Sequence, residues 1–296
     1  MLIRFLACFA AAVALVHGPA LGQSTDHLKV VEQAWKEAMA ASTAGPADIA
    51  LGSQAKLHLG RDYSFVPKAE TGRLMRVFGN GVGEGLYGMV VPKADDQSWI
   101  ITINHTAEGY VKDDDARNWD AEALLQNLKD GTEAQNQTRI EQGVPALDIT
   151  GWIEKPGYDA ERHRLIWSLR AEERGAAAGA AATVNYNTYA LGRDGYFELN
   201  LLTSDDVIDG EKRHAKAALA ALEYLPGKGY GDFNSETDLI AEYGLAALIG
   251  GVAAKKLGLL ALIGVFVLKF AKLIAVGVAI AGGVLFKLFR RNRSES

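Results

Sequence analysis

The stretch AATVNYNTYALGRDGYFELNLLT, residues 181–203, decides the fold class of this chain. Two runs of alternating apolar and polar side chains flank GRDG at 192–195, and this pattern predicts two antiparallel strands joined by a tight turn. Alternation places Asn185 and Asn187 on one face of the first strand and Tyr186 on the other. The hairpin therefore predicts an antiparallel sheet that carries amide side chains on one face.

Other segments with alternating apolar and polar residues occur elsewhere in the chain. Segments whose apolar residues have helical spacing lie between them. The runs are joined to one another as hairpins, not as strand–helix–strand repeats, which predicts an α+β fold with an antiparallel sheet and helices on one face. Asp120 is the expected N-cap of the longest helix. Strands are predicted within 47–59, 63–67, 86–92, 98–105 and 146–173 (two strands around Pro156-Gly157), and helices within 25–42, 69–79, from 120 onward and 211–224.

Charge divides the chain into unlike parts. Residues 23–240 carry 34 acidic and 22 basic side chains, whereas residues 241–296 carry eight basic and two acidic ones. An acidic body repels the phosphates of nucleic acid, so no nucleic-acid partner is expected. The basic, apolar C-terminal part suits an anionic membrane surface.

The N-terminus has the three parts of a secretory signal peptide. Arg4 supplies the positive charge, residues 5–16 are apolar, and small residues precede an expected cleavage site before Gln23. The single cysteine, Cys8, lies in the apolar run, so cleavage would leave a chain without thiols. Disulfides and cysteine metal sites are then excluded.

The C-terminal region predicts a membrane anchor at residues 257–286, which are apolar apart from Lys269 and Lys272. Those two lysines share one helix face and would bind a lipid phosphate, line an oligomer or lie near an interface. A single span leaves a basic cytoplasmic tail, 287–296, as the positive-inside rule expects. The residues assigned to the membrane are Lys269, Lys272, Arg290, Arg291 and Arg293.

Two alternatives concern this anchor. The region could instead form two helices, 239–254 and 257–289, packed as a hairpin. Small residues also recur every fourth position, as they do on helix faces that pair within membranes, and these faces predict a possible homo-oligomer. They are Ala246, Gly250, Ala254 and Gly258, and then Ala271, Ala275, Ala279 and Gly283.

The predicted organisation places one folded domain on the periplasmic side of the inner membrane, held by a single span that contacts lipid. Its parts are a signal peptide (1–22), an N-terminal helix (23–44), an exported α+β domain (45–226), a flexible connector (227–238), an interfacial helix (239–256), the anchor (257–286) and the basic tail.

Two polar groups are candidates for a site. Asp113, Asp114 and Asp115 could help to bind a hard cation, but adjacent acids also suit a solvated turn that enters a helix. Asn185 and Asn187, with Trp152 on a nearby strand, form a candidate face for a sugar or peptide, although a solvated sheet face would need no ligand.

The sequence contains no recognisable catalytic motif. The histidines at 58, 105, 163 and 214 lack zinc-ligand spacing and are expected at the surface or at strand edges. We therefore predict no catalytic residues and no cofactor. The predicted function is a non-enzymatic binding or scaffolding module of the cell envelope with an unknown envelope protein as partner. The alternative is an envelope hydrolase whose carboxylates are assembled by the fold.

The chain contains several short motifs: YVKDDDA (110–116), WDA (119–121), GW (151–152) before Pro156, VNYNT (184–188), LGRDG (191–195), DFN (232–234), YGLAA (243–247) and AAKK (253–256). With these motifs the chain resembles the bacterial family of uncharacterised membrane-anchored proteins catalogued as domain of unknown function 2167. This resemblance implies a signal, an exported domain and a C-terminal anchor, with no established activity and no site residues. A fold of this kind is also similar, by analogy alone, to small accessory modules of the PsbP type.

Overall fold

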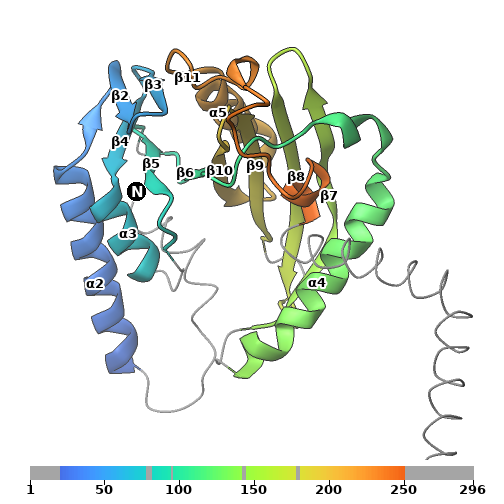
Figure 1. Ribbon diagram of the computed structural model, residues 1–296. Helices are drawn as coiled ribbons and strands as arrows, with labels where there is room; N and C mark the ends of the chain where they lie inside the picture. Colours follow the sequence, from blue (N-terminus) through green and yellow to red (C-terminus); the bar gives the residue numbers. More distant parts are fainter. Residues whose placement is uncertain (1–20, 78–81, 95, 142–144, 178–180, 251–296) are drawn as a thin grey trace, which may run out of the picture. The chain divides into compact units, whose positions relative to one another are not determined.

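The computed structural model describes residues 21–77, 82–94, 96–141, 145–177 and 181–250 (Figure 1), and of residues 21–28, 117, 118 and 138 it describes only the backbone. The helices are α2 (Leu21–Ala40), α3 (Lys68–Val77), α4 (Ala121–Glu141) and α5 (Ile208–Ala220), with short 3-10 turns η1 (Asp114–Asn118) and η2 (Tyr230–Asp232). The strands are β1 (Thr43–Ala44), β2 (Ala47–Leu51), β3 (Ala55–Leu59), β4 (Tyr63–Pro67), β5 (Leu86–Pro92), β6 (Ile100–Thr106), β7 (Leu147–Asp159), β8 (Arg164–Glu173), β9 (Thr183–Leu191), β10 (Tyr196–Ser204) and β11 (Leu222–Tyr224).

The strands form two antiparallel sheets. The larger has eight strands in the order β1-β4-β5-β6-β10-β9-β8-β7, and the smaller has the order β11-β3-β2. The predicted hairpin at 181–203 is present as β9 and β10, paired from Thr183 with Ser204 to Leu191 with Tyr196. Asp120 caps α4, because its Oδ1 accepts hydrogen bonds from the backbone N–H groups of Glu122 and Ala123. The α+β prediction with an antiparallel sheet is confirmed.

One face of the large sheet is apolar across its central strands, and we call it the continuous face. Ile101 and Ile103 of β6, and Phe197 and Leu199 of β10, are fully buried there. The small sheet and α5 cover this face, since both contribute to the same hydrophobic core. Side chains two apart in a strand share a face, so the alternation in β6 and β10 dictates this packing.

The opposite face holds two separate apolar clusters, and we call it the divided face. Helices α2 and α3 bury one cluster against β4, β5 and β6, with Ile100 among its members. Helix α4 and residues 230–249 bury the other against β8 and β9, with Leu169 among its members. Figure 1 shows α2 with α3, and α4, over opposite ends of the sheet. The prediction of helices on one face only is therefore wrong, because apolar residues on both faces of the strands require a cover.

The hairpin of β7 and β8 differs from its prediction. The strand β7 continues through Pro156 and Gly157 to Asp159, and the turn lies at residues 160–163 instead. The pairing of β7 with β8 shifts between Glu154 and Gly157. Because β7 is an edge strand, a proline there removes no ladder hydrogen bond on its open side, and a register shift accommodates it.

Residues 226–241, which include the predicted connector, contact the domain along their length. Tyr110 stacks between Tyr230 and Phe233, with ring centroids 4.3 and 3.9 Å apart. Arg193 makes two hydrogen bonds to the Asp238 carboxylate, at 2.7 and 2.8 Å. Aromatic stacking and a two-pronged guanidinium contact hold this segment against the domain in the structure.

The start of the predicted interfacial helix is not helical. Residues 239–241 run beside Tyr110, whose N–H donates to Leu239 O and whose carbonyl accepts from Ala241 N–H. Helical structure begins at Ala246. The chain divides after Gly250 into a second unit, 251–296, which lies outside the described residues.

Candidate functional site

The divided face has a polar centre that follows from strand register. One row across the strands reads Ile100, Leu202, Asn185, Leu169 and Trp152. Its first member belongs to the α2–α3 cluster, and its last two belong to the α4 cluster. Asn185 therefore lies on the divided face, between the two clusters.

The next rows extend this polar centre. Register pairs Thr102 with Asn200 and Asn200 with Asn187. A third row contains Asn104, Glu198 and Tyr189. We call the whole group the amide patch; its members are Thr102, Asn104, Asn185, Asn187, Tyr189, Glu198 and Asn200.

Hydrogen bonds within the amide patch are few and long. Asn187 Nδ2 donates to Asn185 O at 3.2 Å, and Asn200 Nδ2 donates to Asn185 Oδ1 at 3.4 Å. Asn200 Oδ1 is buried and has no hydrogen-bond partner among the described residues. A buried amide oxygen without a donor costs about 1–3 kcal/mol, so this acceptor is left unsatisfied within the described residues.

Glu198 is the acidic member of the patch. Burial raises its pKa above the ordinary value of 4.5, while a hydrogen bond from Tyr189 acts in the opposite direction. Tyr189 Oη donates to Glu198 Oε1 at 3.2 Å, and burial raises the pKa of that tyrosine well above its usual value. Tyr189 therefore keeps its proton and acts as the donor of the pair.

The three predicted ligand residues lie on the same face, with different surroundings. Asn187 is buried, and Asn185 is half-buried in the patch. Trp152 lies at the far end of its row, and its Nε1 donates to Ala121 O of α4 at 3.2 Å. Trp167 is the aromatic residue paired with Asn187. Trp152 thus positions α4, and Trp167 borders the patch more closely.

Sequence reasoning missed four polar members of the patch, namely Thr102, Asn104, Glu198 and Asn200. The signal was present in ITIN (101–104) and ELN (198–200), where polar residues alternate with buried apolar ones. The pairing of β6 with β10 brings these residues together, and it is not visible in either strand alone.

Two of the three adjacent aspartates, Asp113 and Asp115, serve different contacts. Asp113 Oδ2 accepts a hydrogen bond from Tyr158 at 2.7 Å and lies 3.5 Å from His163 Nδ1. Asp115 accepts from the N–H groups of Leu245 and Ala246, at the start of the last described helix. No group of three or more possible metal ligands gathers within the described ranges. In this part of the structure Asp113 and Asp115 connect distant segments.

Gly244 explains part of the YGLAA motif. A Cβ at this position would lie 2.7 Å from an Asp115 carboxylate oxygen, closer than side chains tolerate. The motif residues near 115 and 244 therefore meet in space, although about 130 positions separate them.

The predicted anchor and its basic residues, Lys269, Lys272, Arg290, Arg291 and Arg293, lie outside the described residues. Within the described part of the chain, no helix combines the length and the apolarity that crossing a bilayer requires.

A family model and a solved structure match this chain. The family model described as "Protein of unknown function (DUF2167)" matches residues 43–281. A solution structure of cyanobacterial PsbP (CyanoP) from Synechocystis sp. PCC 6803 aligns over 62% of this chain and 91% of its own, with 8% identity and a TM-score of 0.34. No curated protein matches the chain.

Proposed function

Because the chain belongs to the DUF2167 family, whose function is unknown, its own geometry has to suggest a role, and we propose a non-enzymatic binding module of the bacterial cell envelope. The amide patch is its ligand face. The observation that carries the proposal is the gathering of amide side chains on one face of β9 and β10, among which Asn200 Oδ1 has no donor within the described residues.

The patch suits a neutral ligand rich in hydroxyl groups, such as an oligosaccharide. Amide side chains both donate and accept hydrogen bonds, which matches the double role of a sugar hydroxyl. Trp167, which is buried in the α4 cluster, borders the patch through its pairing with Asn187. Four members, including Asn185 and Asn200, are half-buried and therefore partly accessible.

The patch favours binding over hydrolysis. Glycoside hydrolysis by an acid and a base requires two carboxyl groups on either side of the scissile bond. Of the seven members of the patch, Glu198 is the single carboxylate. The hydrolase alternative would need a second carboxylate to reach this face.

The location of the module is part of the same proposal. The signal-like residues 1–22 would export it, and the apolar residues 257–286 would hold it to the inner membrane, with the acidic domain in the periplasm. Carbonate extraction of membranes tests this: the intact chain should stay with the lipid fraction, and its release by salt alone would contradict the anchor.

Titration with chitotriose and maltotriose, followed by NMR amide shifts and tryptophan fluorescence, tests the ligand face. We expect shifts concentrated in β6, β9 and β10, and their loss in an Asn187→Ala/Asn200→Ala double variant. Gln126→Ala, an exposed amide of α4 outside the patch, is the matched control and should bind like the wild type. Shifts elsewhere, or binding unaffected by the double variant, would overturn the assignment.

A further inference from the structure

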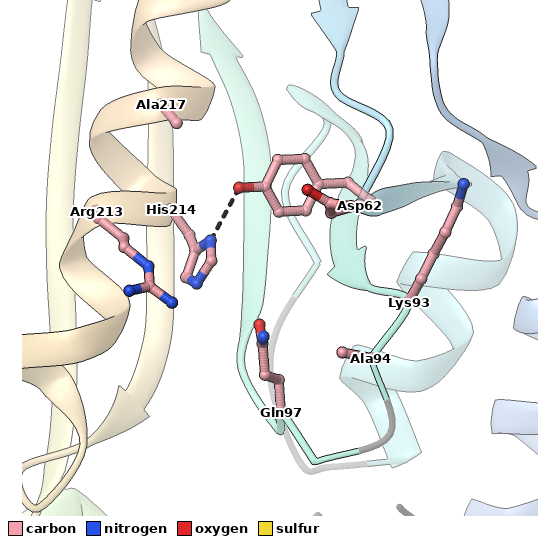
Figure 2. Close-up of a pocket in the computed structure, with 8 residues that line it drawn as sticks. Asp62, Lys93, Ala94, Gln97, Arg213, His214 and Ala217 are labelled. Carbon is pink, nitrogen blue, oxygen red and sulfur yellow. Dashed lines mark hydrogen bonds between the residues drawn. The ribbon is translucent and has the colours of Figure 1, made fainter.

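A cavity of about 610 Å³ lies on the side of α5 that faces the start of β4 and the connection from β5 to β6. Figure 2 shows its lining, which includes Tyr63, Gln97 and His214. The volume is in the range of sites for small molecules. The cavity belongs to the continuous face, so it is separate from the amide patch on the divided face.

The floor of the cavity is fixed by a chain of contacts. His214 Nδ1 is 2.8 Å from Tyr63 Oη, and the imidazole stacks on the fully buried Trp99 with ring centroids 4.7 Å apart. Trp99 Nε1 donates to Gln97 Oε1 at 2.9 Å. Since the ring is stacked and hydrogen-bonded at once, its orientation toward the cavity is set before any ligand binds.

The surroundings of the imidazole favour its neutral form. Burial, with the nearby charge of Arg213, lowers the pKa of His214, and burial raises the pKa of Tyr63. We assign the tyrosine as donor to Nδ1, which places the imidazole proton on Nε2. Figure 2 shows that nitrogen on the side of the ring away from the dashed hydrogen bond. The floor therefore presents an N–H donor.

Opposite charges lie on the two sides of this floor. Arg213 comes from α5 and Asp62 precedes β4, and Figure 2 shows Arg213 beside His214 on the helix and Asp62 on the other side of the dashed hydrogen bond. Both residues are exposed, and neither side chain has a hydrogen bond or ion pair with another residue in the described ranges. Lys93 differs, because its Nζ donates to the carbonyls of Gly45 and Arg61 at 2.6 and 2.7 Å.

We propose that this cavity binds a small zwitterion, a free amino acid or short peptide, whose carboxylate meets Arg213 and whose ammonium group meets Asp62. A guanidinium binds a carboxylate through two parallel hydrogen bonds, and the His214 N–H adds a third donor on the same side. Arg213 and Asp62 have no hydrogen-bond or ion-pair partner among the described residues, whereas Lys93 already donates to two carbonyls. The two remaining opposite charges match a ligand with both charges better than a simple anion.

Calorimetric titration of the full-length protein with L-alanyl-L-alanine tests the proposal. We expect binding that falls at least about tenfold when the probe is N-acetylated or when its carboxylate is amidated. Arg213→Gln should lower the affinity for the dipeptide by a similar factor. This variant should then bind the dipeptide no more tightly than it binds the dipeptide amide. The Asp62→Asn variant should bind the dipeptide no more tightly than it binds the N-acetylated dipeptide.

Both substitutions change exposed side chains, so the fold is expected to survive, and circular dichroism checks this. Arg162→Gln, an exposed arginine paired with Asp159, is the matched control and should bind like the wild type. Inorganic phosphate separates a general anion site from the proposed one. A Kd weaker than about 10 mM for the dipeptide, binding insensitive to both blocked termini, or phosphate bound as tightly as dipeptide would each overturn the proposal. These results are independent of the saccharide titration, because the two sites lie on opposite faces.

Discussion

Side chains alternate between the two faces of the eight-stranded sheet, and the two faces differ in what those side chains contact. On the continuous face, side chains such as Ile103 and Leu199 meet a single core that α5 and the small sheet close. On the divided face, the apolar clusters stop short of the centre, and the amide patch lies between them. Burial of apolar area supplies most of the stability of a domain, so the continuous face should dominate folding. The patch contributes less and is free to serve binding.

The largest expected effect follows from truncating the continuous face. Phe197 is fully buried, and its ring contacts those of Tyr87, His105 and Tyr224. Phe197→Ala should lower the free energy of unfolding by about 3–5 kcal/mol, measured by urea denaturation. Val30→Ala, on the exposed side of α2, should change it by less than about 0.5 kcal/mol. A cost below about 1 kcal/mol for Phe197→Ala would refute the dominance of this face.

Two asparagines, the buried Asn136 and the half-buried Asn200, allow a second comparison. Asn136 in α4 is fully satisfied, because it exchanges hydrogen bonds with both backbone groups of Leu147 and donates to Glu133. Asn136→Ala leaves those backbone groups unpaired and should cost about 2–3 kcal/mol. Asn200→Ala removes an unsatisfied acceptor and should cost less than about 0.5 kcal/mol or stabilise the domain. Denaturant midpoints measure both, and equal costs would show that Asn200 is satisfied in solution.

Acid should act first through the continuous face. His105 and His214 are buried there, contrary to their expected surface positions, and burial lowers the pKa of each below the ordinary value of 6.5. As the pH falls below about 6.5, the unfolded chain takes up protons before the folded one, so stability decreases toward the lowered pKa. Thermal melts between pH 7.5 and 5 should show this decrease. His105→Asn should make it shallower, and an unchanged slope would contradict the role of His105.

The smallest expected effect is the pH dependence of stability that Glu198 of the amide patch contributes. Its sign is opposite to that of the histidines, because stability is lost as the pH rises. Because the folded pKa of Glu198 is raised, its protonated form contributes stability that is fully present below pH 4.5 and is lost as the pH rises through the raised value. Glu198→Gln should therefore melt at a higher temperature than the wild type at pH 7.5. The difference should vanish near pH 4, and a gap that persists there would assign the effect to packing instead.

Much of the local structure could be predicted from the residues. Alternation in VNYNT predicts which face Asn185 occupies, and Asp120 marks the start of α4, because each depends only on neighbours along the chain. The turn expected at Pro156 was placed wrongly, since an edge strand tolerates a proline that a central strand would not. Helices were expected on one face because periodicity does not say which side of a sheet a helix covers.

By itself the sequence determined the α+β class, the hairpin at 181–203 and the polar face of β9. Only the tertiary structure decided which polar residues meet. Thr102 lies beside Asn200, and Asp62 shares a cavity with Arg213, across about 100 and 150 positions of chain. Side-chain periodicity within a strand or helix is set by local backbone geometry. Which strands become neighbours depends on the packing of the whole core, so both candidate sites emerged only when the chain was folded.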